Sequence, residues 1–146
     1  VLVGDPDPGN PASVPDTSLR AWHGQHGIEW WGRREDMPAV LQLGHIACLP
    51  SYREGLPKVL LEAAACGLPL VTTDAPGCRD VVHDGDNGFL VPIRNAQALA
   101  LALARLIEDA ALRATMGRRA REIVLAEFSQ ERIIKETLAV YLELTP

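Results

Sequence analysis

The fold is decided by the stretch Glu54-Gly55-Leu56-Pro57-Lys58-Val59-Leu60-Leu61-Glu62, in which two carboxylates enclose the beginning of an apolar helix. Pro57 suits the first position of a helix, where a missing N–H costs nothing. The backbone N–H groups of Gly55, Leu56 and Lys58 are then left unpaired at the positive end of that helix. This end of the helix is therefore predicted to bind an anion.

The two glutamates can border one pocket. Glu54 lies just before the helix, and Glu62 lies inside it with its side chain leaning back toward the N-terminus. Carboxylates repel phosphate, so they are better suited to accept hydrogen bonds from sugar or ribose hydroxyls. On spacing alone, a structural explanation fits equally well: Glu54 would stabilise the helix dipole, and Glu62 would be an ordinary solvated helix residue. However, Glu62 precedes the small residues 63–66, and we expect a carboxylate in such an apolar segment to need a partner.

Length and composition indicate one soluble globular domain. The chain has 146 residues, of which 47% are hydrophobic and 23% are charged, enough for a real core. Its net charge of -5 argues against nucleic acid as a partner. Cys48, Cys66 and Cys78 lack metal-ligand spacing and indicate reduced thiols of a cytosolic protein. We therefore expect neither a metal nor a cofactor, and any contact with a membrane would be peripheral or made by further sequence.

Short apolar strands alternate with helices along the chain. We expect strands at 1–3, 28–31, 45–49, 70–73 and 89–91, and helices at 15–25, 35–43, 57–66, 78–82, 96–108, 111–127 and 130–142. This order predicts an α/β fold with a doubly wound, Rossmann-like parallel sheet and C-terminal helices. Ligands of such sheets bind at the carboxyl ends of the strands. The loops after Trp31, at 51–56 and at 74–77 would meet there.

Three motifs carry a resemblance to a known family: Leu49-Pro50-Ser51-Tyr52-Arg53-Glu54-Gly55-Leu56-Pro57-Lys58, Leu61-Glu62-Ala63-Ala64-Ala65-Cys66-Gly67-Leu68-Pro69 and Asp84-Gly85-Asp86-Asn87-Gly88. They resemble the C-terminal, nucleotide-sugar-binding domain of retaining family 4 (group 1) glycosyltransferases, which is half of the two-domain GT-B fold. The resemblance covers nearly all of residues 1–146, and the stretches at 52–58 and 76–80 are similar to bacterial enzymes that make lipid-linked oligosaccharides and surface polysaccharides. It implies a cytoplasmic hexosyl- or N-acetylhexosaminyl-transferase, at most peripheral at the inner face of the membrane.

The resemblance also implies roles for individual residues. Glu54 would be the catalytic residue that faces the donor sugar, and Glu62 would bind the ribose hydroxyls of a nucleoside diphosphate sugar. The other donor-binding residues would be Gly55, Leu56, Lys58, Gly32, Arg33 and Arg34. The last three form a turn that would border the base, although the two arginines fit solvated loop charges equally well.

The chain departs from the family at its N-terminus. The family's domain begins with a further strand and helix that carry an Arg and a Lys for the diphosphate, whereas Val1-Leu2-Val3 resembles the second strand. We therefore expect a truncated domain that binds its donor weakly and is inactive without the acceptor-binding N-terminal domain of the same protein. The acceptor would be a hydroxyl, for example of a lipid-linked saccharide. Strand edges left unpaired would favour a remodelled or self-associated form.

Two other functions fit part of the pattern. A glycoside hydrolase also places two carboxylates across a sugar, but a helix end suited to phosphate has no purpose there. A non-catalytic nucleotide-sugar-binding or interaction domain stays open, because the basic residues of the family's first helix are missing from the chain.

Overall fold

The computed structural model describes residues 1–10 and 13–144 and divides the chain into two compact units, 1–40 and 41–146. Within the described residues, every helix is too short or too polar to cross a membrane.

The first unit contains little regular structure. Helix α1 (Asp16–Trp22) carries an ion pair of 2.5 Å between Asp16 and Arg20, and helix α2 (Met37–Gln42) lies at the boundary with the second unit. Both helices are shorter than expected. The strands expected at 1–3 and 28–31 are wrong, because the described part of these segments forms one isolated parallel bridge, Leu2 to Trp30. Beyond the bridge, the N–H of Gly4 donates to the carbonyl oxygen of Gly32 at 2.9 Å, but both glycines have a positive φ, so the pairing does not continue as regular strands.

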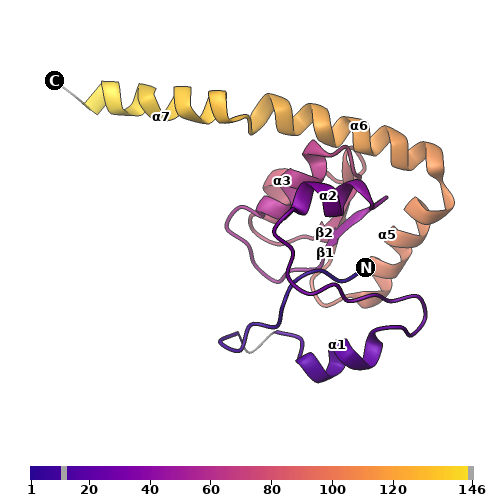
Figure 1. Ribbon diagram of the computed structural model, residues 1–146. Coiled ribbons are helices and arrows are strands. Elements are labelled where there is room, and N and C mark those ends of the chain that lie inside the picture. The colour runs from indigo at the N-terminus through magenta and orange to yellow at the C-terminus, as the bar shows by residue number, and fades with distance from the viewer. Residues whose placement is uncertain (11–12, 145–146) are drawn as a thin grey trace. The chain divides into compact units, whose positions relative to one another are not determined.

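The second unit is built on a parallel sheet of three strands in the order β1-β2-β3. These strands are β1 (Ala47–Leu49), β2 (Leu70–Thr73) and β3 (Gly88–Val91), and β1 and β2 are labelled in Figure 1. Leu70 stands opposite Ala47 on one side and Gly88 on the other. All residues of β2 are buried, as a central parallel strand requires. Since the strands are parallel, their carboxyl ends lie at one edge of the sheet.

Helices pack against this sheet, and the predicted α/β fold with a parallel sheet and C-terminal helices is confirmed. The helices that contact the sheet are α3 (Lys58–Ala65), α4 (Cys78–Val81), α5 (Ala96–Glu108) and α6 (Ala110–Glu127), and α7 (Gln130–Leu144) follows α6. A core cluster joins β2 and β3 to α5 and α6 through Val71, Phe89, Val91, Ala102, Leu106 and Met116. By contrast, the described part of α7 has no buried residue.

Helices α3 and α6 approach each other closely. Gly67 ends α3, as predicted, and a Cβ at Gly117 of α6 would collide with the carbonyl oxygen of Gly67. Ala63 of α3 and Ala120 of α6 are fully buried. Small residues therefore let α6 lie directly against the end of α3, which fixes α3 and its first turn on the sheet.

The turn between α4 and β3 depends on one buried amide. The side chain of Asn87 donates from Nδ2 to the carbonyl oxygen of Val81 at 2.9 Å and accepts the N–H of His83 at 2.8 Å. Asn87 is only 1% exposed, so water cannot replace these partners. The amide thus sets where β3 begins and where its carboxyl end lies.

We predict that Asn87→Ala lowers the free energy of unfolding by about 2–3 kcal/mol, because it leaves a buried donor and a buried acceptor unpaired. The matched control is Asn95→Ala, which removes a single exposed capping bond to the N–H of Ala98 and should cost about 1 kcal/mol. Urea denaturation followed by circular dichroism measures both variants. Equal losses for the two would contradict the structural role given to Asn87.

Candidate functional site

The loop between β1 and α3 carries Glu54, Gly55 and Leu56 of the predicted site and is fixed to its neighbours by two hydrogen bonds. The hydroxyl of Thr73, at the end of β2, donates to the carbonyl oxygen of Ser51. The N–H of Glu54 donates to the carbonyl oxygen of Pro76 at 3.2 Å. The end of β2 and the turn after it therefore hold the backbone of this loop.

Gly77 makes the second of these contacts possible. Its φ is 80°, a value that side-chain-bearing residues rarely adopt, and a Cβ there would collide with the carbonyl oxygens of Glu54 and Gly55. The loops at 51–56 and 74–77 thus meet as predicted, and they meet through backbone atoms. Any side chain at position 77 would push the Glu54 loop away from β2.

Helix α3 begins at Lys58, one residue later than predicted. Pro57 has the extended ψ of 95° and occupies the N-cap rather than the first helical position, and its carbonyl oxygen accepts the N–H of Leu60 at 3.0 Å. Gly55, Leu56 and Lys58 are exposed, and within the described residues their N–H groups donate to no protein atom. The positive end of α3 is therefore open to a ligand.

The two glutamates differ in their surroundings. Glu54 is half-buried and Glu62 is exposed, and within the described ranges neither side chain forms an ion pair or a hydrogen bond. The expectation that Glu62 needs a partner because of its apolar segment is wrong, since Ala63 and Ala64 take the buried face of α3 and leave Glu62 in water. Its role in binding stays a prediction.

The predicted base-binding turn belongs to the first unit. The N–H of Arg33 donates to the carboxylate of Asp5 at 3.0 Å, and the guanidinium of Arg34 lies 5.8 Å from the ring centre of Trp31. Gly32 accepts the N–H of Gly4 through its carbonyl oxygen at 2.9 Å. The structure brings together Glu54, Gly55, Leu56, Lys58 and Glu62 in the second unit, and the assignment of the turn residues stays a prediction.

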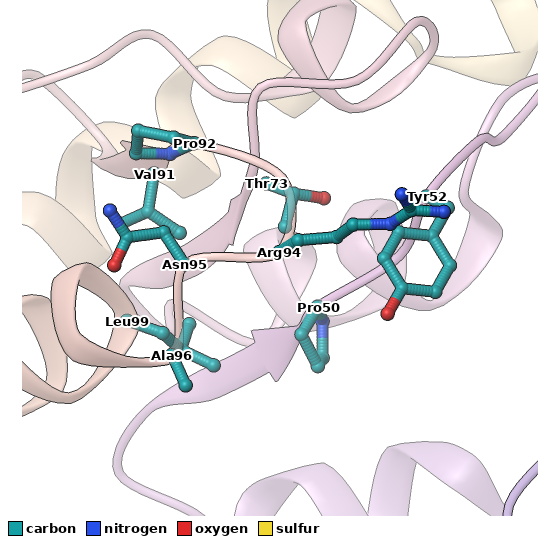
Figure 2. Close-up of a pocket in the computed structure, with 9 residues that line it drawn as sticks. All are labelled: Pro50, Tyr52, Thr73, Val91, Pro92, Arg94, Asn95, Ala96 and Leu99. Carbon is teal, nitrogen blue, oxygen red and sulfur yellow. The ribbon is translucent and has the colours of Figure 1, made fainter.

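Sequence reasoning missed a pocket at the same edge of the sheet. It has a volume of about 300 Å³ and lies between the loop after β1 and the loop after β3. Figure 2 shows the side chain of Arg94 reaching from the second loop to the ring of Tyr52 in the first. The rule that ligands bind at the ends of parallel strands could have drawn attention to Arg94, which comes shortly after β3.

The arrangement offers hydrogen-bond and electrostatic partners. Among residues 1–10 and 13–144, no three His, Cys, Asp or Glu side chains lie close enough together to hold a metal ion. The open helix end and the carboxylate of Glu54 lie at the strand ends of a parallel sheet that is covered by helices, which defines the class: a Rossmann-like α/β domain. The chain belongs to the family of group 1 glycosyl transferases, whose model matches residues 1–109.

Individual relatives support the family. The chain is 32% identical over 141 residues to the N,N'-diacetylbacillosaminyl-diphospho-undecaprenol alpha-1,3-N-acetylgalactosaminyltransferase of Campylobacter jejuni, covering 97% of this chain and 36% of that protein. It is 31% identical over 119 residues to the N-acetyl-alpha-D-glucosaminyl L-malate synthase of Bacillus anthracis, covering 82% of this chain and 31% of that protein. The chain thus spans about a third of the length of these curated relatives.

Solved structures show the same fold. The HepE protein of Anabaena in complex with UDP matches with a TM-score of 0.84 and 28% identity, over 99% of this chain and 40% of that one. Sucrose-phosphate synthase from Thermosynechococcus elongatus matches with a TM-score of 0.85 and 29% identity, over 98% of this chain and 37% of that one.

We predict that Gly77→Ala destabilises the second unit more than Gly85→Ala does. Both glycines have nearly the same positive φ, 80° and 79°, but a Cβ at Gly85 meets nothing within 4 Å. Backbone strain should cost about 1–2 kcal/mol in both variants, and the collision at Gly77 should add about 1–3 kcal/mol. Thermal unfolding measures the difference, and amide chemical shifts should change at residues 54–58 in Gly77→Ala alone. Indistinguishable variants would contradict the contact.

Proposed function

We propose that the chain is the donor-binding part of a retaining glycosyltransferase that takes a sugar from a nucleoside diphosphate sugar. The observation that carries the proposal is the open start of α3, with the exposed N–H groups of Gly55, Leu56 and Lys58 beside the half-buried Glu54. A uridine nucleotide is the favoured donor, because HepE of Anabaena was solved with UDP and with UDP-glucose. The matched sequences are 28% identical in the UDP complex and 27% identical in the UDP-glucose complex.

The start of α3 suits the diphosphate of the donor. Unpaired N–H groups and the positive end of the helix dipole would bind the phosphate oxygens without any ionised side chain. Such a terminus contributes only about 0.3–1 kcal/mol when exposed. Further binding must therefore come from Glu62, which would accept hydrogen bonds from the ribose hydroxyls, and from the turn at 32–34, which would border the base.

Glu54 would act on the sugar. In the transfer, the bond between the anomeric carbon and the diphosphate oxygen breaks, and a bond to the acceptor oxygen forms on the same face of the ring. The acceptor proton passes to the leaving phosphate. Negative charge grows on the diphosphate and positive charge on the sugar ring. The end of α3 and the Glu54 carboxylate would each stabilise one of these charges in the transition state.

We propose that the acceptor is a lipid-linked saccharide in bacterial surface polysaccharide synthesis, bound by an N-terminal domain of the complete polypeptide. The support is the Campylobacter jejuni relative, whose name describes transfer to a diphospho-undecaprenol saccharide. The reaction would then take place at the cytoplasmic face of the membrane. The chain by itself would bind donor and not turn it over.

In the complete polypeptide, Glu62→Gln should weaken UDP binding roughly 10-fold or more, because a charged acceptor of ribose hydrogen bonds is replaced by a neutral one. The matched control is Glu108→Gln in α5, an exposed helical glutamate away from the site. Isothermal titration calorimetry measures both. Equal UDP affinities in the wild type and Glu62→Gln would refute the ribose assignment.

In the complete polypeptide, Glu54→Gln should lower kcat roughly 100-fold or more while leaving UDP affinity nearly unchanged, because the carboxylate acts on the charge that forms in the transition state. The assay offers a panel of nucleotide sugars with lipid-linked acceptors, and plain glycosides as the comparison substrate. Hydrolysis of the glycosides would favour a hydrolase. Rapid transfer by the isolated residues 1–146 would contradict the proposal that this chain binds the donor but needs the N-terminal domain for transfer.

A further inference from the structure

The pocket between the loops after β1 and β3 shares no residue with those assigned to the donor. Its volume of about 300 Å³ falls at the lower end of the range for small-molecule pockets. Apolar side chains form most of its wall, and four polar residues complete it. The lining consists of Pro50, Val91, Pro92, Ala96 and Leu99 with Tyr52, Thr73, Arg94 and Asn95.

Two of the four polar side chains already form hydrogen bonds to backbone groups of the protein. The hydroxyl of Thr73 donates to the carbonyl oxygen of Ser51. The side-chain oxygen of Asn95 accepts the N–H of Ala98 at 2.9 Å and so caps α5. The chemistry that the pocket offers to a ligand is therefore set by the other two polar residues, Tyr52 and Arg94.

Arg94 gives the pocket a positive charge. Its guanidinium lies 5.5 Å from the ring centre of Tyr52, an arrangement that holds the group without using its N–H edges. Within the described residues, Arg94 forms no ion pair. The lining contains no Asp or Glu, although the whole chain carries a net charge of -5. The free N–H edges of Arg94 match the oxygens of a carboxylate or a phosphate.

We propose that this pocket binds a small molecule that has one carboxylate or phosphate group and an apolar or weakly polar body. The anionic group accepts hydrogen bonds from Arg94, and the body lies against the wall formed by Pro50, Val91 and Leu99. Tyr52 is a positioning residue, because its ring fixes the guanidinium at the rim. This site is separate from the start of α3 and does not depend on the donor assignment.

The test is a titration of the intact 146-residue chain followed by amide chemical shifts. The ligands are glycerol 3-phosphate, butyrate and, as the uncharged comparison, glycerol. We expect saturable shifts at Tyr52, Arg94 and Ala96 with one or both anions and none with glycerol. The anion that binds more tightly identifies the group. Shifts that do not saturate with either anion, or that glycerol reproduces, would overturn the proposal.

Variants decide whether Arg94 carries the binding. Arg94→Gln should weaken anion binding roughly 10-fold or more, and Arg94→Lys should fall between this variant and the wild type, because it keeps the charge but loses the two-pronged geometry. Tyr52→Leu should weaken binding a few-fold through the lost ring. Arg118→Gln, which removes an exposed arginine from α6, should leave anion binding within about twofold. The dispersion of the amide spectrum checks that each variant is folded.

UDP, titrated into the same proteins, separates this proposal from the donor site. Arg94→Gln should change UDP affinity by less than about twofold, and UDP shifts should centre on residues 54–62. Anion affinity that is the same in Arg94→Gln as in the wild type would refute the pocket site, whatever UDP does. Anion shifts confined to residues 54–58 would also refute it, because they would place the anion at the start of α3.

Discussion

The parallel pairing of β2 with both of its neighbours is the constraint on which the second unit depends. Leu70 is held between Ala47 and Gly88, and every residue of β2 is buried. This register brings the ends of β1, β2 and β3 to one edge and so places the Glu54 loop, the Gly77 turn and Arg94 together. The position of these residues at one edge therefore follows from backbone hydrogen bonds between the strands.

Much of this unit could be predicted from local sequence. Buried parallel strands are continuous apolar runs. The predicted strands at 45–49 and 70–73 contain β1 and β2, and the one at 89–91 covers all of β3 but its first residue, Gly88. The apolar segments 1–3 and 28–31 look similar in composition but form only the bridge between Leu2 and Trp30. A strand needs partners along its whole length, and composition does not show how far the pairing extends. Composition also does not show where a short helix ends: α1 and α2 are shorter than the predicted helices at 15–25 and 35–43.

In the candidate site, too, local features could be predicted from the sequence and contacts across the fold could not. The open helix end follows from Pro57 and the residues beside it, so local reasoning found it, although it placed Pro57 one position too far into the helix. The burial of Glu62 could not be judged from its neighbours, because in a helix adjacent residues point in different directions. Contacts across the fold were also missed. Gly77 lies against the Glu54 backbone, and Arg94 lies over Tyr52, at separations in sequence that no motif links.

The two ends of α3 differ in how their backbone groups are satisfied. Arg121 of α6 donates to the carbonyl oxygen of Ala65 at the end of α3, and Arg113 donates to those of Leu106 and Ile107 at the end of α5. These bonds satisfy carbonyl groups that a helix terminus leaves unpaired, and the cations also complement the negative end of each dipole. No comparable side-chain cap is present at the described start of α3. The protein thus caps the carboxyl end of this helix with its own side chain and leaves the described start, beside Glu54, without a side-chain cap.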